Sequence, residues 1–167
     1  IPANYYNEYA LLVRTMQQQK VVPKAIYSVL GGAASQYKFV KEFPDASEGI
    51  IDCNHWFNPQ DKRSAELRKR AEAKGLFFSY EMFMTYTAMR LLADAIERAK
   101  STDRAAIIAA LEQSSFADHI MPYGPTKFVN GQNQGAQPLM TQVSKGDIKV
   151  IIPREYRQMD PIFPLKA

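Results

Sequence analysis

The chain is 167 residues long, with 46% apolar residues, 23% charged residues and a net charge of +4. That balance is typical of a folded globular protein and excludes a disordered one, and no apolar run approaches the ~18 residues of a membrane-spanning helix. The basic residues between positions 62 and 74 alternate with acidic ones. We therefore interpret them as a solvated helix face and expect no nucleic-acid partner.

The first part of the chain alternates between helical and extended patterns. The expected elements are a helix at 5–20, a strand at 25–30, a short helix at 34–43, a strand at 48–53 and a polar helix at 59–74. Pro44 and Asp45 are expected to end the short helix, and Asn58-Pro59 to begin the polar one. Because the chain enters its first helix with neither a leading strand nor a signal peptide, we expect it to be a portion of a longer protein.

The strongest helical pattern covers residues 79–99. Its apolar side chains recur every three or four residues and lie on one face; they include Met82, Tyr86, Met89, Ala93 and Ile96. Ser79 is a suitable N-cap, and no Gly or Pro interrupts the segment. A face this wide must pack against something large, and we expect a sheet.

The remainder is a short helix followed by extended structure. A helix at 103–113 is expected after a Thr102 or Asp103 cap, then a short strand at 126–129 closed by the Asn130-Gly131 turn. Residues 139–143 and 148–152 alternate in the manner of a β-hairpin, and a proline-containing extended tail follows.

Alternating strands and helices predict an α/β fold with a parallel sheet. In such sheets ligands bind at the carboxyl ends of the strands, which is where the segment from Ser28 to Ser35 falls. Gly31 and Gly32 there would allow a ligand to approach the backbone. A plain tight turn explains the same two glycines equally well.

Four segments appear in an order that resembles the carboxyl-terminal half of periplasmic solute-binding proteins of the branched-chain amino-acid type. The segments are YEMFMTYTAMRLLADAIERA, ALEQSSF, YGPTKFVNGQNQG and TQVSKGDIKVIIP. The resemblance implies part of a type I periplasmic binding protein fold, with two parallel-sheet lobes joined by a hinge. It implies that residues 1–54 and 138–167 belong to the second lobe, that 55–137 belong to the first, and that the amino-terminal half of the parent protein is absent.

The resemblance also implies two groups of ligand-binding residues. The first is the loop with Ser28, Leu30, Gly31 and Gly32, and the second is the helix start with Tyr80, Glu81 and Phe83. The family's loop often carries an acid that meets a ligand ammonium group, whereas no carboxylate lies between Ser28 and Ser35. Because an unpaired ammonium is costly to bury, this favours an aromatic or aliphatic carboxylate without an amine. Glu81 could instead supply the charge, or simply stabilise the first turn of its helix.

The implied function is that of a periplasmic, non-enzymatic component of an ABC importer, whose partners are a small organic acid or amino acid and a membrane permease. We expect no metal, no cofactor and no catalytic residues. The alternatives are a ligand-sensing domain of a larger receptor and a small α/β phosphate-binding enzyme domain, although neither a GxGxxG nor a GxxxxGK[ST] pattern occurs. Another copy of the chain, or the missing amino-terminal half, is expected to cover the helix at 79–99.

Overall fold

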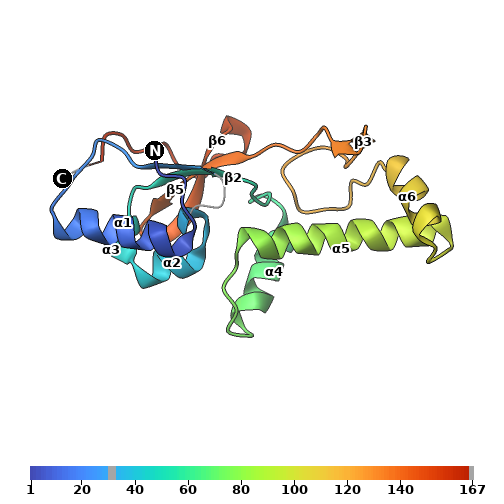
Figure 1. Ribbon diagram of the computed structural model, residues 1–167, viewed down its shortest axis with the longest axis horizontal. Coiled ribbons are helices and arrows are strands. Elements are labelled where there is room, and N and C mark those ends of the chain that lie inside the picture. Colours follow the sequence, from blue (N-terminus) through green and yellow to red (C-terminus); the bar gives the residue numbers. More distant parts are fainter. Residues whose placement is uncertain (30–32, 166–167) are drawn as a thin grey trace.

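The structure is a computed structural model that describes residues 1–29 and 33–165 (Figure 1). The α-helices are α1 (Tyr6–Gln18), α2 (Tyr37–Glu42), α3 (Pro44–Ser47), α4 (Lys62–Glu72), α5 (Tyr80–Ala99) and α6 (Arg104–Glu112). The strands are β1 (Tyr27–Val29), β2 (Ile51–Asn54), β3 (Phe128–Val129), β4 (Gln132–Asn133), β5 (Leu139–Ser144) and β6 (Asp147–Ile152). Single 3₁₀ turns, η1 (Ala33–Ser35) and η2 (Arg154–Tyr156), complete the elements.

The main sheet has the strand order β1-β2-β5-β6 and is mixed. β1 and β2 are parallel, because the helical segment between them returns the chain to the same end of the sheet. β5 and β6 are antiparallel, as the predicted hairpin requires, and β5 pairs antiparallel with β2. The α/β class is therefore confirmed, with the predicted parallel pairing at β1 and β2, while β5 and β6 join the sheet as the predicted antiparallel hairpin. The reason is that strands joined by a tight turn can only run in opposite directions.

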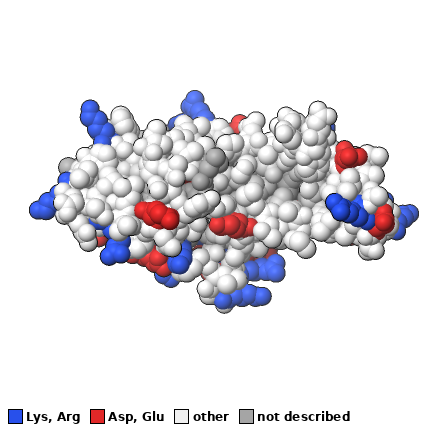
Figure 2. Space-filling view, in the orientation of Figure 1, with Lys and Arg blue, Asp and Glu red and all other residues white. Residues whose placement is uncertain are grey.

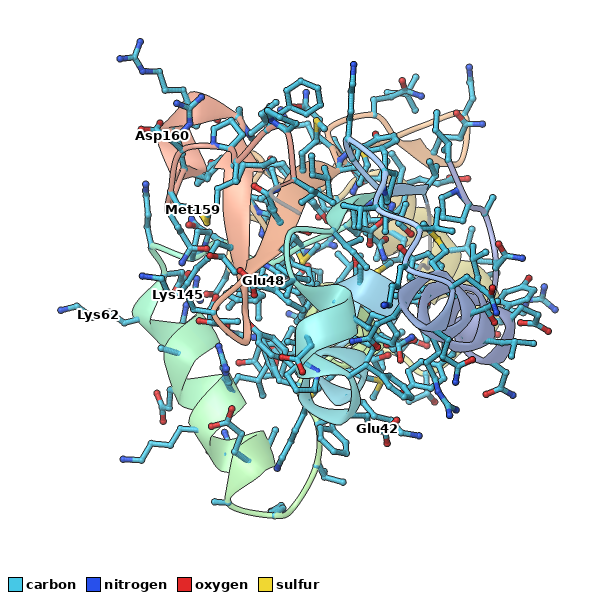
Figure 3. The ribbon with its side chains drawn as sticks, turned by 90° about the vertical axis from the view of Figure 1, so that its left-hand side faces the viewer. Glu42, Glu48, Lys62, Lys145, Met159 and Asp160 are labelled. Atoms are coloured by element: carbon cyan, nitrogen blue, oxygen red, sulfur yellow. The ribbon has the colours of Figure 1, made fainter. Side chains whose placement is uncertain are left out.

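The hairpin turn is held from outside by Glu48. Lys145 and Gly146 both have positive φ angles, as a two-residue type I′ turn requires. The carboxylate of Glu48 accepts the backbone N–H of Lys145 at 2.9 Å, and the two residues lie close together in Figure 3. This contact fixes the end of the hairpin against the segment that leads into β2.

Helices α1, α2 and α3 cover one face of the sheet (Figure 1). Apolar side chains from both layers meet there to form the core of this part of the molecule. Its buried members include Tyr9, Val13, Phe39, Val40, Ile50, Val143, Ile148 and Val150.

Helix α5 starts beside this core and then runs away from the sheet, toward α6 and the small β3–β4 hairpin (Figure 1). Its first turn is anchored by Phe83, which is fully buried against the rings of Trp56, Phe57 and Phe78 at centroid distances of 5.3 to 5.5 Å. Farther along, Met89 remains 60% exposed. Among the described residues, then, no sheet covers the length of α5, contrary to expectation.

Two predicted helix boundaries are wrong. Pro44 does not end the helical region but begins α3, because proline fits the first position of a helix, where no N–H is needed. The break falls instead at Phe43, whose φ of −132° and ψ of 61° are not helical. The N-cap of α4 is Asp61, which accepts the N–H of Arg63, while Asn58 only closes a turn onto Gln60. The cap predicted at Asp103 is confirmed by its bonds to the next turn.

Candidate functional site

The residues that follow η1 lie beside the start of α5 in the structure. Gln36, directly after the 3₁₀ turn η1, forms an antiparallel bridge with Ser79, which directly precedes α5. The end of η1 therefore meets the amino-terminal end of α5. A helix start with free N–H groups next to a strand end is a common setting for ligand binding.

The individual site residues differ in how they could meet a ligand. Ser28 is buried, Tyr80 is half-buried and Glu81 is exposed. Burial, and next the neighbouring Glu81 carboxylate, raises the pKa of the Tyr80 phenol. Phe83 is fully buried in the aromatic cluster, where it supports the start of α5. Leu30, Gly31 and Gly32 lie outside the described residues.

Asp52 is a polar residue of this region that the sequence reasoning missed. It lies opposite Ser28 in the parallel pair and opposite Thr141 in the antiparallel one, at the centre of the sheet. Its side chain accepts hydrogen bonds from the Ser35 hydroxyl and, at 2.9 Å, from the backbone N–H of Cys53. Asp52 thus ties η1 to β2, immediately before the bridge to Ser79. The only signal in the sequence was one acid next to the apolar residues Ile51 and Cys53 of a short strand.

Within the part of the chain that the structure describes, the Asp52 carboxyl forms no ion pair. The residue is 1% exposed, and burial raises its pKa to about 6. The Cys53 amide and the nearby Ser28 hydroxyl lower the pKa by less than burial raises it, although Ser28 falls short of hydrogen-bond geometry. The hydroxyls of Ser28 and Tyr9 are both buried without a partner among the described residues. Burial also raises the pKa of Tyr9.

A concave region lies beside α5. It is a hollow of about 300 Å³ between α5 and the segment 121–136, and its lining includes Met84, Leu91 and Met121. Few charged side chains lie along α5 on the face seen in Figure 2, and most Lys and Arg are at the periphery. This surface is suited to contact with other apolar groups.

His119 fixes the loop that borders this hollow. Its Nε2 donates to the Gly124 carbonyl at 3.1 Å, and its Nδ1 accepts the N–H of Met121 at 3.3 Å. An imidazole that both donates and accepts must be neutral. Burial lowers its pKa accordingly.

The described residues contain no group of three or more His, Cys, Asp or Glu side chains placed to hold a metal ion. Within the same residues, no helix is long and apolar enough to cross a bilayer.

Comparison with known proteins identifies the family. The sequence profile of the periplasmic binding protein family matches residues 2–147, so the chain belongs to this family of solute-binding proteins. The family-level prediction from the sequence is confirmed. No curated protein matches the chain.

Solved structures share the fold. A leucine-binding protein from Thermotoga maritima is similar, with a TM-score of 0.69, 21% identity, and coverage of 89% of this chain and 42% of that one. An extracellular ligand-binding receptor from Rhodopseudomonas palustris HaA2 is similar with a TM-score of 0.68 and 19% identity, and the match covers 89% of this chain and 45% of that one. A proposed branched-chain amino acid ABC transporter protein from Silicibacter pomeroyi has a TM-score of 0.66 and 16% identity, and the match covers 96% of this chain and 45% of that one. The chain thus spans less than half the length of each of these relatives and has the fold of that portion.

Proposed function

We propose that the protein is the extracytoplasmic solute-binding component of an ABC importer and that it binds a small organic carboxylate. The observation that carries this proposal is the family match over residues 2–147. The names of two similar structures, a leucine-binding protein and an ABC transporter protein, support the same role. In this proposal the protein acts in the periplasm, delivers its ligand to a membrane permease and catalyses no reaction.

The arrangement of the elements supports the proposed division into lobes. In this division, residues 1–54 and 138–167 form part of the second lobe, with the main sheet and α1 to α3. Residues 55–137, with α4, α5, α6 and the β3–β4 hairpin, form part of the first. In Figure 1 the chain leaves the sheet after β2 and returns to it at β5, and α5 and α6 extend outward between these points. The side chains of Met84 and Met89 on α5 are exposed, which supports the proposal that either the amino-terminal half of the parent protein or another copy of the chain packs against this helix.

The proposed ligand site is the junction between the loop after β1 and the start of α5. Ser28 of β1 is the proposed contributor from this side, together with residues 30–32, which lie outside the described part of the chain, and Tyr80 and Glu81 are those from α5. Tyr80 supplies a half-buried ring with a polar hydroxyl, which suits a cleft that becomes enclosed when a ligand binds. Phe83 would act behind Tyr80, as part of the aromatic support.

Calorimetric titration of the natural full-length protein tests the proposal. The ligands are L-leucine, L-phenylalanine and their amine-free analogues 4-methylpentanoate and 3-phenylpropanoate. We expect saturable one-to-one binding of at least one of them, weakened about tenfold or more by Tyr80→Ala. Phe163→Ala, a change at a 68% exposed aromatic side chain of the tail, is the matched control. Failure of all four compounds to bind would contradict the proposed ligand class.

A sensing role is the second candidate, since one similar structure is an extracellular ligand-binding receptor. Ligand-dependent stimulation of ATP hydrolysis by a permease complex in proteoliposomes separates the two roles. An importer component stimulates the ATPase, whereas a sensing domain binds the ligand without doing so.

A further inference from the structure

We propose that the main sheet carries a second binding site at the edge opposite the proposed ligand site, and that it takes a small amphiphilic amine. Such a ligand has an apolar body and one cationic nitrogen. The inference goes beyond the proposed function and does not depend on it. It starts from a cavity of about 690 Å³ between the end of α1, the segment that leads into β1, α3 and the carboxyl-terminal tail. Helices α1 and α3 lie on the same face of the sheet (Figure 1).

The cavity lies at the amino ends of β1 and β2. Its lining residues Pro23 and Ile26 precede β1, and Glu48 and Gly49 precede β2. Because the two strands are parallel, their amino ends share one edge of the sheet. The proposed ligand site lies beyond the carboxyl end of β1, so the cavity is a separate region of the molecule.

Hydrogen bonds fix the wall that the tail contributes. The side-chain amide of the buried Gln142 donates to the carbonyls of Gly49 at 2.9 Å and Ile162 at 3.0 Å, and it accepts the N–H of Ile162 at 2.9 Å. The N–H of Leu165 donates to the carbonyl of Lys24 at 2.8 Å. A side chain at Gly49 would overlap that of Leu165, so the glycine leaves the space in which Leu165 sits. These contacts hold the tail in place as one side of the cavity.

Most of the lining is apolar. The apolar side chains come from four segments that are distant in the sequence, and they are Val13, Met16, Val21, Val22, Pro23, Ile26, Ala46, Ile162 and Leu165. A volume of this size and a mostly apolar wall with a few polar groups are typical of small-molecule sites. The wall therefore favours a ligand with an aliphatic or aromatic body.

The charges at the cavity decide the sign of the ligand. Asp45 and Glu48 line it, and its described lining includes no Lys or Arg. Neither carboxylate forms an ion pair within residues 1–29 and 33–165. Two negative charges beside an apolar wall repel a fatty acid and attract a cation with an apolar body. Because Glu48 already accepts the N–H of Lys145, Asp45 is the carboxylate to test.

The test uses three compounds with the same eight-carbon chain: octylamine, 1-octanol and octanoate. Each is titrated into the natural full-length protein, labelled with ¹³C at the methionine methyl groups, and followed by NMR. We expect one-to-one binding of octylamine with a dissociation constant of about 1 mM or lower. The alcohol should bind at least about threefold more weakly and the acid more weakly still. Binding of octanol or octanoate as tight as that of octylamine, or no saturable binding of octylamine, would overturn the inference.

The methionine signals locate the bound amine without any substitution. Met16 lines the cavity, whereas Met89 is 60% exposed on α5 and outside it. Octylamine should shift the Met16 methyl signal and leave that of Met89 unchanged. Equal shifts of both signals would indicate non-specific association and would overturn the inference.

Variants then assign the charge preference to one residue. Asp45→Asn should weaken octylamine binding about threefold or more and leave octanol binding unchanged. Glu8→Gln, at an exposed acid of α1 outside the cavity, is the matched control and should bind octylamine like the wild type. An equal loss in both variants, or no loss in Asp45→Asn, would overturn the assigned role of Asp45.

Two further variants separate this cavity from the proposed ligand site. Ala46→Trp fills the cavity and should abolish octylamine binding, while Tyr80→Ala should leave it unchanged. The opposite pattern in folded proteins would place the amine elsewhere and overturn the inference. If Ala46→Trp does not fold, the Met16 signal of the wild type decides. None of these outcomes bears on the proposed function, which the calorimetric series of acids tests separately.

Discussion

Replacing Asp52 by Asn should make the protein more stable at neutral pH. The pKa of Asp52 rises from 3.8 to about 6 in the folded protein. The folded state therefore holds the proton more tightly than the unfolded state. The stability that this proton contributes is fully present below pH 3.8 and is lost as the pH rises to about 6. Each pKa unit corresponds to about 1.36 kcal/mol, so the loss amounts to about 3 kcal/mol.

An asparagine keeps the local contacts while removing the charge. Its amide oxygen can still accept the N–H of Cys53, and its NH₂ group can donate to the Ser35 hydroxyl. Above pH 6.5, Asp52→Asn should therefore be more stable than the wild type by up to about 3 kcal/mol. Near pH 3.5 the two should converge.

Urea denaturation of the ligand-free protein at several pH values between 3.5 and 8 measures this difference. Taking the difference between variant and wild type cancels the titration of all other groups. Asp45→Asn, at an exposed aspartate of α3, is the control and should run parallel to the wild type. Parallel curves for Asp52→Asn as well would refute the reasoning, because they would mean that the carboxylate is not perturbed by burial.

Three further predictions concern α5 and its neighbourhood. Phe83→Ala should destabilise the protein by about 3–5 kcal/mol in urea denaturation, against about 0.5 kcal/mol or less for the exposed Met89→Ala, and equal effects would contradict the anchoring role. The His119 imidazole should titrate below 6.5 in NMR spectra. Because its pKa is lowered, its contribution to stability is present above pH 6.5 and is lost as the pH falls, and a midpoint at or above 6.5 would contradict the lowering of the pKa by burial. The isolated 167-residue chain should self-associate in analytical ultracentrifugation because the face of α5 is incompletely covered, and a cooperatively melting monomer of 18.9 kDa would show that no partner is needed.

The sequence alone determined the features that depend on neighbouring positions. The apolar repeat predicted a helix at 79–99, and the structure has α5 at Tyr80–Ala99. Alternation predicted the hairpin at 139–152, which is β5 and β6. The ordered set of motifs was sufficient to name the family. These signals can be read locally because helix periodicity, strand alternation and turn chemistry involve residues only a few positions apart.

Only the tertiary structure could decide the features that join distant positions. The cluster of Trp56, Phe57, Phe78 and Phe83 forms because two segments cross, and no local pattern marks its members as partners. The same holds for Asp52. Its environment is formed by Ser28 on the neighbouring strand β1 and by Ser35 of η1, which donates a hydrogen bond to it. In the sequence it is one acid between two apolar residues of a short strand. Burial raises the pKa of its carboxyl, and burial is a property of the packed fold.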